Sequence, residues 1–176
     1  RKGDFGFIFA RPESGKTTFL ADQVSFMAEQ CEGPILWFNN EQVGAVVLTR
    51  CQQACLGLTT TELFKDYEKT RAEYRKITRE KIFIYDAANI HRRDVDRLCR
   101  RYNPSLIIFD QIDKIKGFDS DRYDLELKVL YQWARELAKE YGPVIGVCQA
   151  GASGEGKKYL SMDDVDSSKT AKQGEA

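Results

Sequence analysis

The stretch ARPESGKTT, residues 10–18, holds the residue types in this sequence that are best suited to binding phosphate. It matches the pattern G-x-x-x-x-G-K-[ST] except at the first position, where Ala10 replaces glycine. An apolar run precedes the stretch and a segment of helical period follows it, so backbone N–H groups at a helix start would surround a phosphate. The spacing therefore predicts a phosphate-binding loop; a chance G-K-T at the start of a helix is the alternative.

Each position of the loop has an expected role. Pro12 has no N–H, so the donors to phosphate should come from Glu13 onward, and Glu13 itself should point outward because its carboxylate would repel the phosphates. Gly15 stands where backbone and phosphate approach closely. Lys16 should contact the β- and γ-phosphates, and the Thr17 hydroxyl should bind Mg²⁺. The predicted nucleotide-binding residues are Arg11, Pro12, Glu13, Ser14, Gly15, Lys16, Thr17 and Thr18.

Two acidic residues that follow apolar runs could complete a hydrolytic site. Asp110 ends LIIFD, as the metal-supporting aspartate of a Walker B strand does; the string is common by itself, and the loop at 10–18 strengthens it. Glu41 lies in NNEQ, directly after the apolar run ILWFN, and is the candidate general base for the attacking water. An acidic residue at a helix start is the alternative for Glu41.

Three more polar residues lie at the end of the last apolar run or after it. Gln149 closes that run and could hydrogen-bond the γ-phosphate and sense its presence, or could simply be a polar strand end. Lys157 and Lys158 lie in the glycine- and serine-containing stretch 151–164, which is the best candidate for a nucleic-acid contact that depends on the nucleotide state. A solvated loop is the alternative. Residues 113–122 are a weaker candidate for a second such loop.

These residues need a frame that brings them together, and the apolar pattern supplies one. Short apolar runs alternate with segments of helical period, which is typical of an α/β fold with a mostly parallel sheet covered by helices. Ligands bind at the carboxyl ends of the strands in such sheets. The expected strands are residues 5–10, 35–39, 81–87, 106–112 and 143–150.

Helices are expected between these strands. One begins at Lys16, and its apolar side is expected to consist of Phe19, Leu20, Val24 and Met27. Residues 65–80 alternate in charge and predict a solvated helix. A helix over 124–141 has an apolar side made of Leu130, Trp133, Leu137 and Tyr141, and Gly142 with Pro143 should end it.

The segment IHRRDVDRLCRRYN predicts a further helix with two contrasting faces. Its apolar face consists of Val95, Leu98, Cys99 and Tyr102. Its basic face consists of Arg93, Arg97, Arg100 and Arg101. A basic helix face of this kind is more often exposed to solvent or part of a subunit contact than bound to DNA. The single histidine, His91, is assigned no catalytic role.

Composition sets the broad class. With 176 residues, 42% hydrophobic and 31% charged, the chain is expected to form a single globular domain over 1–176. Lys plus Arg and Asp plus Glu number 27 each, so the zero net charge argues neither for nor against a nucleic-acid partner. The five scattered cysteines are expected as reduced thiols in a cytoplasmic protein, without a zinc site.

Two expectations concern what surrounds the chain. No apolar run approaches the roughly 18 residues of a membrane span, so no membrane partner is expected. Because residue 1 is arginine rather than an initiator methionine, the sequence is expected to be part of a longer protein.

The motifs together resemble those of one family. GDFGFIFARPESGKTTF, residues 3–19, closely resembles the Walker A region of DnaB-type replicative helicases, of bacterial or phage type, whose loops read A-R-P-x-x-G-K-T with alanine first. NNEQ is similar to the region of the family's catalytic glutamate, LIIFDQI to its Walker B strand, and ARELAKEYGPVIGVCQA to the segment leading to its γ-phosphate-sensing glutamine. The tail MDDVDSSKTAKQGEA looks like the segment after the second DNA-binding loop, and residues 43–80 match least.

The resemblance implies a RecA-like core that hydrolyses ATP with Mg²⁺. It also implies a hexameric ring, single-stranded DNA held in the channel by loops near 113–122 and 151–164, a primase or loader as partner, and a place in the cytoplasm of a bacterial or phage-infected cell. The family's arginine finger is expected beyond residue 176. Two alternatives stay open: a RecA- or RadA-like recombination or repair ATPase, and a RecA-like regulatory ATPase that does not bind DNA.

Overall fold

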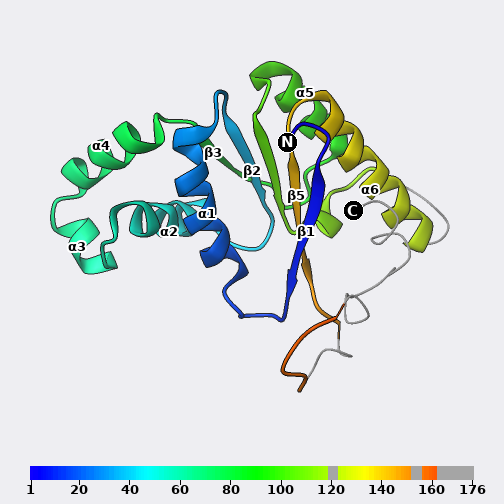
Figure 1. Ribbon diagram of the computed structural model, residues 1–176, viewed down its shortest axis with the longest axis horizontal. Helices are drawn as coiled ribbons and strands as arrows, with labels where there is room; N and C mark the ends of the chain where they lie inside the picture. The colour runs from blue at the N-terminus through cyan, green and yellow to red at the C-terminus, as the bar shows by residue number, and fades with distance from the viewer. Residues whose placement is uncertain (119–122, 152–155, 162–176) are drawn as a thin grey trace.

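A parallel sheet forms the frame of the computed structural model, which describes residues 1–118, 123–151 and 156–161 (Figure 1). In this part of the chain the sheet has five strands in the order β1-β5-β4-β2-β3, and all four pairings are parallel. The strands are β1 (Phe5–Ala10), β2 (Ile35–Asn39), β3 (Ile82–Asp86), β4 (Leu106–Asp110) and β5 (Val144–Gln149). All carboxyl ends therefore lie at one edge of the sheet, as the sequence predicts.

Helices cover both faces of the sheet (Figure 1). The helices on one side are α1 (Lys16–Gln30), α2 (Gly44–Leu56), α3 (Thr60–Lys65) and α4 (Tyr67–Thr78). The helices on the other side are α5 (Arg92–Tyr102) and α6 (Tyr123–Glu140), and a short 3-10 helix, η1 (Ile112–Lys114), follows β4. None of the described helices combines the length and the apolar character that crossing a membrane requires.

Alternation along the central strands divides the core into two layers. In β2, Trp37 packs with α1 and α2, while its neighbours Leu36 and Phe38 pack with α5 and α6; all three are fully buried. In β4, Ile108 and Phe109 divide in the same way. Because both faces of these strands are covered, their sequences read as continuous apolar runs rather than as alternating ones.

The expected strands are confirmed, with small differences at their ends. The strand expected over 106–112 stops at Asp110 because the chain turns at Gln111 into η1. The apolar side of α6 is confirmed, since Leu130, Trp133 and Leu137 are buried. In α1 the expected side is wrong at Phe19, which is 51% exposed, because Thr17 and Ala21 instead turn toward the interior.

The segment between β2 and β3 differs most from expectation. Two helices, α2 and α3, occupy residues for which the sequence predicts no element. The solvated helix expected over 65–80 is interrupted at Asp66, whose side chain caps α4 by accepting a hydrogen bond from the Lys69 N–H (3.3 Å). One face of α4 is also buried, at Thr70, Tyr74 and Thr78, because α4 packs against α2.

The structure also places the residues of α5 and the cysteines. Val95 and Cys99 are buried, and the four arginines of the basic face are exposed. His91 caps α5, since its Nδ1 accepts a hydrogen bond from the Arg93 N–H (3.2 Å). All five cysteines are free thiols, and the described residues contain no cluster of side chains able to hold a zinc ion.

Candidate functional site

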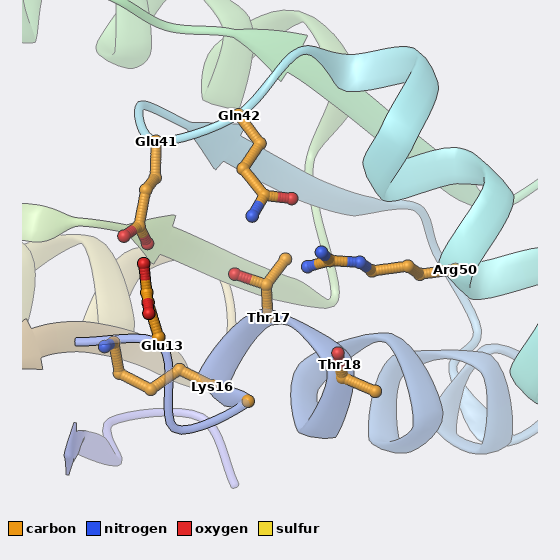
Figure 2. A pocket seen from close by; sticks show the side chains of 8 residues that line it. Glu13, Lys16, Thr17, Thr18, Glu41, Gln42 and Arg50 are labelled. Carbon is orange, nitrogen blue, oxygen red and sulfur yellow. The ribbon is translucent and has the colours of Figure 1, made fainter. Parts of the chain in front are cut away.

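A pocket of about 290 Å³ opens at the carboxyl edge of the sheet (Figure 2). It receives residues from the loop after β1, from the start of α1, from the loop after β2 and from α2. The lining residues are Glu13, Gly15, Lys16, Thr17, Thr18, Glu41, Gln42 and Arg50. Five of the eight were predicted to bind nucleotide and one, Glu41, to activate water; the structure brings these six together.

The backbone after β1 explains why one glycine is needed and another is not. Gly15 is the N-cap of α1 and has φ of 89°, a left-handed conformation that side chains strongly disfavour. Ala10 lies in the strand, in register with Gln149, and its carbonyl accepts a hydrogen bond from the Ala150 N–H (3.0 Å). The position of the missing glycine therefore requires only an ordinary strand residue.

The two residues after Gly15 point into the interior of the site. Lys16 is 6% exposed, and its Nζ donates a hydrogen bond to the Arg11 carbonyl (2.9 Å). The Thr17 hydroxyl donates to Asp110 Oδ2 (3.0 Å) across 93 residues of sequence. The predicted phosphate loop and the predicted metal-supporting strand are thus joined by a direct hydrogen bond.

Asp110 is fully buried, and its Oδ1 has no hydrogen-bond partner among the described residues. Burial raises the pKa of this carboxyl to about 6, against the lowering effects of the Thr17 hydrogen bond and of the Lys16 and Arg50 charges; Glu41 raises the pKa further. A buried carboxylate with an unsatisfied oxygen beside a hydroxyl is a costly arrangement without a ligand. Two hard oxygens in contact fit a divalent cation such as Mg²⁺.

The raised pKa gives a testable dependence of stability on pH. Between about pH 4 and pH 6 the folded protein holds the Asp110 proton more tightly than the unfolded chain does, so the contribution of Asp110 to stability falls as pH rises through this window. We expect Asp110→Asn to raise the free energy of unfolding at pH 8 by about 1–3 kcal/mol, since about two pKa units are removed. Urea unfolding in EDTA at pH 4 to 8 measures this.

The exposed carboxylate of Asp22 on α1 provides a control for that experiment. Because the Asp22 side chain is exposed, Asp22→Asn should change the free energy of unfolding little. If the difference between Asp110→Asn and wild type does not change between pH 4 and pH 6, burial does not raise the pKa of Asp110.

The loop after β2 is tied to β4, which fixes the position of Glu41. The Asn40 N–H donates to the Asp110 carbonyl (2.5 Å), and the Asn40 side chain donates to the Gln111 carbonyl (2.9 Å). The Asn39 side chain donates to the Gln42 carbonyl and closes the turn. Glu41 is exposed to the pocket, and Figure 2 shows its carboxylate directed toward Glu13 and Lys16.

Glu13 differs from its expected orientation. Its side chain lines the pocket and points toward Glu41 instead of pointing outward (Figure 2). The physical reason lies in the backbone, because Glu13 has φ of 58°, which turns its side chain to the pocket side of the loop. Two carboxylates thus share one side of the pocket.

Two lining residues, Gln42 and Arg50, were not predicted. Arg50 comes from α2, whose first residue, Gly44, donates its N–H to Asp86 Oδ1 at the end of β3 (2.7 Å). This contact anchors α2 at the sheet edge, and Figure 2 shows the Arg50 side chain directed at the pocket from the side opposite Lys16. Gly57, with φ of 65°, marks the end of α2 and was the available sequence signal for this helix.

Other predicted residues lie at the pocket's margin. Gln149 is opposite Ala10 in the sheet and does not line the pocket; Arg11, Pro12 and Ser14 belong to the loop but do not line it either. The Arg11 side chain donates a hydrogen bond to the Lys157 carbonyl, so the residues around Lys157 contact the start of the phosphate loop. Lys157 and Lys158 are exposed. Residues 119–122, 152–155 and the tail 162–176 lie outside the described residues.

Comparisons with known proteins agree with this geometry. A family model described as an AAA domain matches residues 1–155. The replicative DNA helicase DnaB of Haemophilus influenzae is 26% identical over 162 residues, which cover 83% of this chain and 34% of that protein. This chain thus spans about a third of the length of that relative. The match confirms the resemblance to DnaB-type replicative helicases that the sequence motifs carry.

Two solved structures have the same fold. One, described as an ATPase domain, superimposes with a TM-score of 0.80 at 17% identity and covers 98% of this chain and 67% of that one. The other, a DnaB-like replicative helicase described with its interactions with primase, gives a TM-score of 0.76 at 18% identity and covers 96% of this chain and 44% of that one. These likenesses confirm the predicted α/β core of RecA-like type.

Proposed function

Because this chain belongs to the AAA domain family, we propose that it is the ATP-hydrolysing motor core, a single RecA-like domain over 1–176, of a hexameric DNA helicase that moves along single-stranded DNA. The observation that carries the proposal is the Thr17–Asp110 hydrogen bond, which joins the phosphate loop to the buried carboxylate in the pocket that Lys16 and Glu41 line. The resemblance to DnaB helicases supports the choice of DNA as the track.

Nucleotide binding would use groups that the structure already directs at the pocket. The backbone N–H groups at the start of α1 and the Lys16 ammonium face the space where phosphates would lie. To contact phosphate, Lys16 exchanges its hydrogen bond with the Arg11 carbonyl for one with a phosphate oxygen. Thr17 and Asp110 would hold Mg²⁺, which when bound neutralises charge on the phosphates.

Hydrolysis would depend on Glu41. Its carboxylate is directed into the pocket toward Glu13 and Lys16, where it can accept a proton from a water molecule that attacks the γ-phosphate. Arg50 also lines the pocket. Its positive charge would stabilise the negative charge that develops on the phosphate oxygens during phosphoryl transfer. Gln149 is the last residue of β5, the strand next to β1, and we assign it the sensing of the γ-phosphate.

The DNA contact would involve the residues around Lys157. Arg11 links the start of the phosphate loop to the Lys157 carbonyl, which gives a short physical connection between nucleotide and the exposed Lys157 and Lys158. One similar structure is described with a primase, so a primase or a loader is the proposed partner of the full-length protein. The proposed place of action is the cytoplasm of a bacterial or phage-infected cell.

The proposal is tested by measuring ATPase rate with and without single-stranded DNA on the full-length protein, beside a strand-separation assay. We expect DNA to raise the ATPase rate and the protein to separate strands. Joint replacement of Lys157 and Lys158 by alanine should weaken DNA binding, and the slope of log affinity against log salt should become less steep by about 1.4, while the ATPase rate without DNA is retained.

The pair Lys65→Ala and Lys69→Ala is the matched control, since both lysines are exposed on α3 and α4, away from Lys157. Strand exchange without strand separation would favour a recombination ATPase. A protein that hydrolyses ATP but never binds single-stranded DNA would favour a regulatory ATPase.

A further inference from the structure

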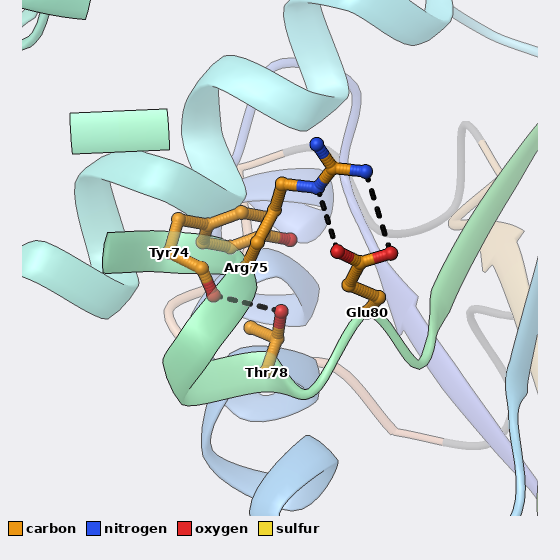
Figure 3. A network of polar contacts seen from close by, with 4 residues as sticks. All are labelled: Tyr74, Arg75, Thr78 and Glu80. Atoms are coloured by element: carbon orange, nitrogen blue, oxygen red, sulfur yellow. Dashed lines mark hydrogen bonds and ion pairs between the residues drawn. The ribbon is translucent and has the colours of Figure 1, made fainter. Parts of the chain in front are cut away.

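A second pocket, of about 230 Å³, lies between α2, α4 and β3 (Figure 3 shows part of its wall). It shares no lining residue with the pocket at the phosphate loop. Leu48 from α2 and Ile82 from β3 give it apolar surface, and the ring of Tyr74, which is 5% exposed, extends that surface. No step of ATP binding or hydrolysis proposed above uses this pocket.

A buried amide faces this pocket without a protein partner. Gln52 is 3% exposed, and its side chain makes no hydrogen bond with any residue that the structure describes. The Gln52 amide is not among the fully enclosed polar groups that lack a partner, so water in the pocket can bind it until a ligand takes the place of that water. The amide of Gln52 is therefore available to a molecule inside the pocket.

The charged side chains that line the pocket are Arg71, Arg75 and Glu80, which together carry one net positive charge. Glu80 pairs with Arg75 through two contacts, Nε to Oε1 (2.9 Å) and a terminal nitrogen to Oε2 (3.3 Å) (Figure 3). The turn that returns Glu80 to Arg75 has φ of 51° at Arg79 and 55° at Glu80. Arg71 lies one helical turn before Arg75 and lines the same pocket, yet it has no hydrogen bond or ion pair within the described part of the chain.

Size and charge together limit what would bind. The volume of about 230 Å³ is below the range usual for pockets that bind drug-sized ligands. A phosphate monoester carries close to two negative charges at neutral pH, whereas the lining offers one uncompensated positive charge. A single carboxylate balances that charge, and its two oxygens can accept from both a guanidinium and an amide.

We propose that the pocket between α2, α4 and β3 binds a monocarboxylate with a small apolar body. The carboxylate accepts hydrogen bonds from Arg71 and Gln52, and the apolar body lies against Leu48, Tyr74 and Ile82. The carboxylate can belong to a free small molecule or to an acidic side chain in a peptide. The proposal is independent of helicase function, because it rests on none of the residues at the phosphate loop.

The test is a titration of the isotope-labelled chain with sodium benzoate, followed by backbone amide NMR. We expect saturable shifts in the amides of residues 48–52 and 71–82. Arg71→Gln should weaken benzoate binding about 10- to 100-fold, as expected for the loss of a charged hydrogen-bond partner. Lys76→Gln is the matched control, because it removes one positive charge from an exposed position of the same helix outside the pocket; its affinity should equal that of wild type.

Further arms separate the possible sources and the possible failures. Gln52→Leu should also weaken binding, and benzyl alcohol, a neutral compound of similar shape, should bind much more weakly than benzoate. Tighter binding of benzoate than of a capped Leu-Glu-Leu peptide assigns the site to a free carboxylate, and the reverse assigns it to a peptide. The proposal is overturned if shifts appear only at residues 13–18, if benzyl alcohol binds equally well, or if Arg71→Gln binds benzoate as wild type does.

Discussion

Replacing Glu41 with glutamine is expected to slow ATP hydrolysis by about 10²- to 10⁴-fold, the usual contribution of a general base, while ATP still binds. Glutamine keeps the size of the side chain and its hydrogen bonding but cannot accept the proton of the attacking water. The loop that carries Glu41 is held by hydrogen bonds of Asn39 and Asn40, so the substitution should leave the loop in place. Single-turnover hydrolysis and equilibrium binding of ATP, measured on the same preparation, separate the two effects.

A second carboxylate in the same pocket makes this experiment sharper. Glu13→Gln removes the same charge from the same side of the pocket, and the Glu13 side chain points toward Glu41. If the two carboxylates act only through the electrostatic effect of their negative charges, both variants should change the rate of ATP hydrolysis by a similar factor. If Glu41 takes the proton, only Glu41→Gln should lose the rate. Glu73→Gln is the control, because Glu73 is exposed on α4 and does not line the pocket; its hydrolysis rate should equal that of wild type. Undiminished hydrolysis in Glu41→Gln would remove Glu41 from its role.

Replacing Lys16 with alanine should abolish tight nucleotide binding. The Lys16 ammonium is buried beside the loop, and a charged hydrogen bond to a phosphate oxygen contributes about 1.5–3 kcal/mol, so the loss of one or two such bonds should weaken ATP binding about 10- to 10⁴-fold. Binding measured by calorimetry and by the ATP-dependent rise of the melting temperature should fall together, because ligand stabilisation follows from affinity.

The control for Lys16 is Lys65→Ala, which removes a lysine from an exposed position at the end of α3. Its affinity for ATP and its melting temperature should match those of wild type. Lys16→Ala also removes one of the hydrogen bonds that the Arg11 carbonyl accepts, while the one from the Ser14 hydroxyl (2.6 Å) remains, so the melting temperature without nucleotide must be measured as well. Wild-type ATP affinity in Lys16→Ala would contradict the assignment of the loop to phosphate binding.

The sheet and most of the pocket could be predicted because their signals are local. Strands β2 and β4 are buried along their whole length, so each appears in the sequence as an unbroken apolar run. The loop residues follow a fixed spacing before α1, and Asp110 follows its strand directly. Once all strands run in one direction, their carboxyl ends must meet, which brings Lys16, Thr17, Glu41 and Asp110 to one edge.

Arg50 could not be predicted because its position depends on a contact between distant residues. Helix α2 begins at Gly44 without a side-chain cap, and it is held by Asp86, which lies 42 residues later. Only Val47, Cys51 and Gln52 of α2 are buried, so its apolar pattern is weak. The orientation of Glu13 likewise depends on one backbone angle that its residue type does not indicate.

The position of β1 in the sheet has a consequence for the synthesis of the protein. Within the described part of the chain, β1 forms strand pairs with β5, from Phe5 opposite Val144 to Ala10 opposite Gln149. Strands β2, β3 and β4 can pair while the chain is still being made, but the strand before the phosphate loop must wait for the last one. A ribosome that stalls before residue 144 therefore holds a chain in which β1 has no partner strand, so we expect ATP to stabilise only chains that have been translated through β5.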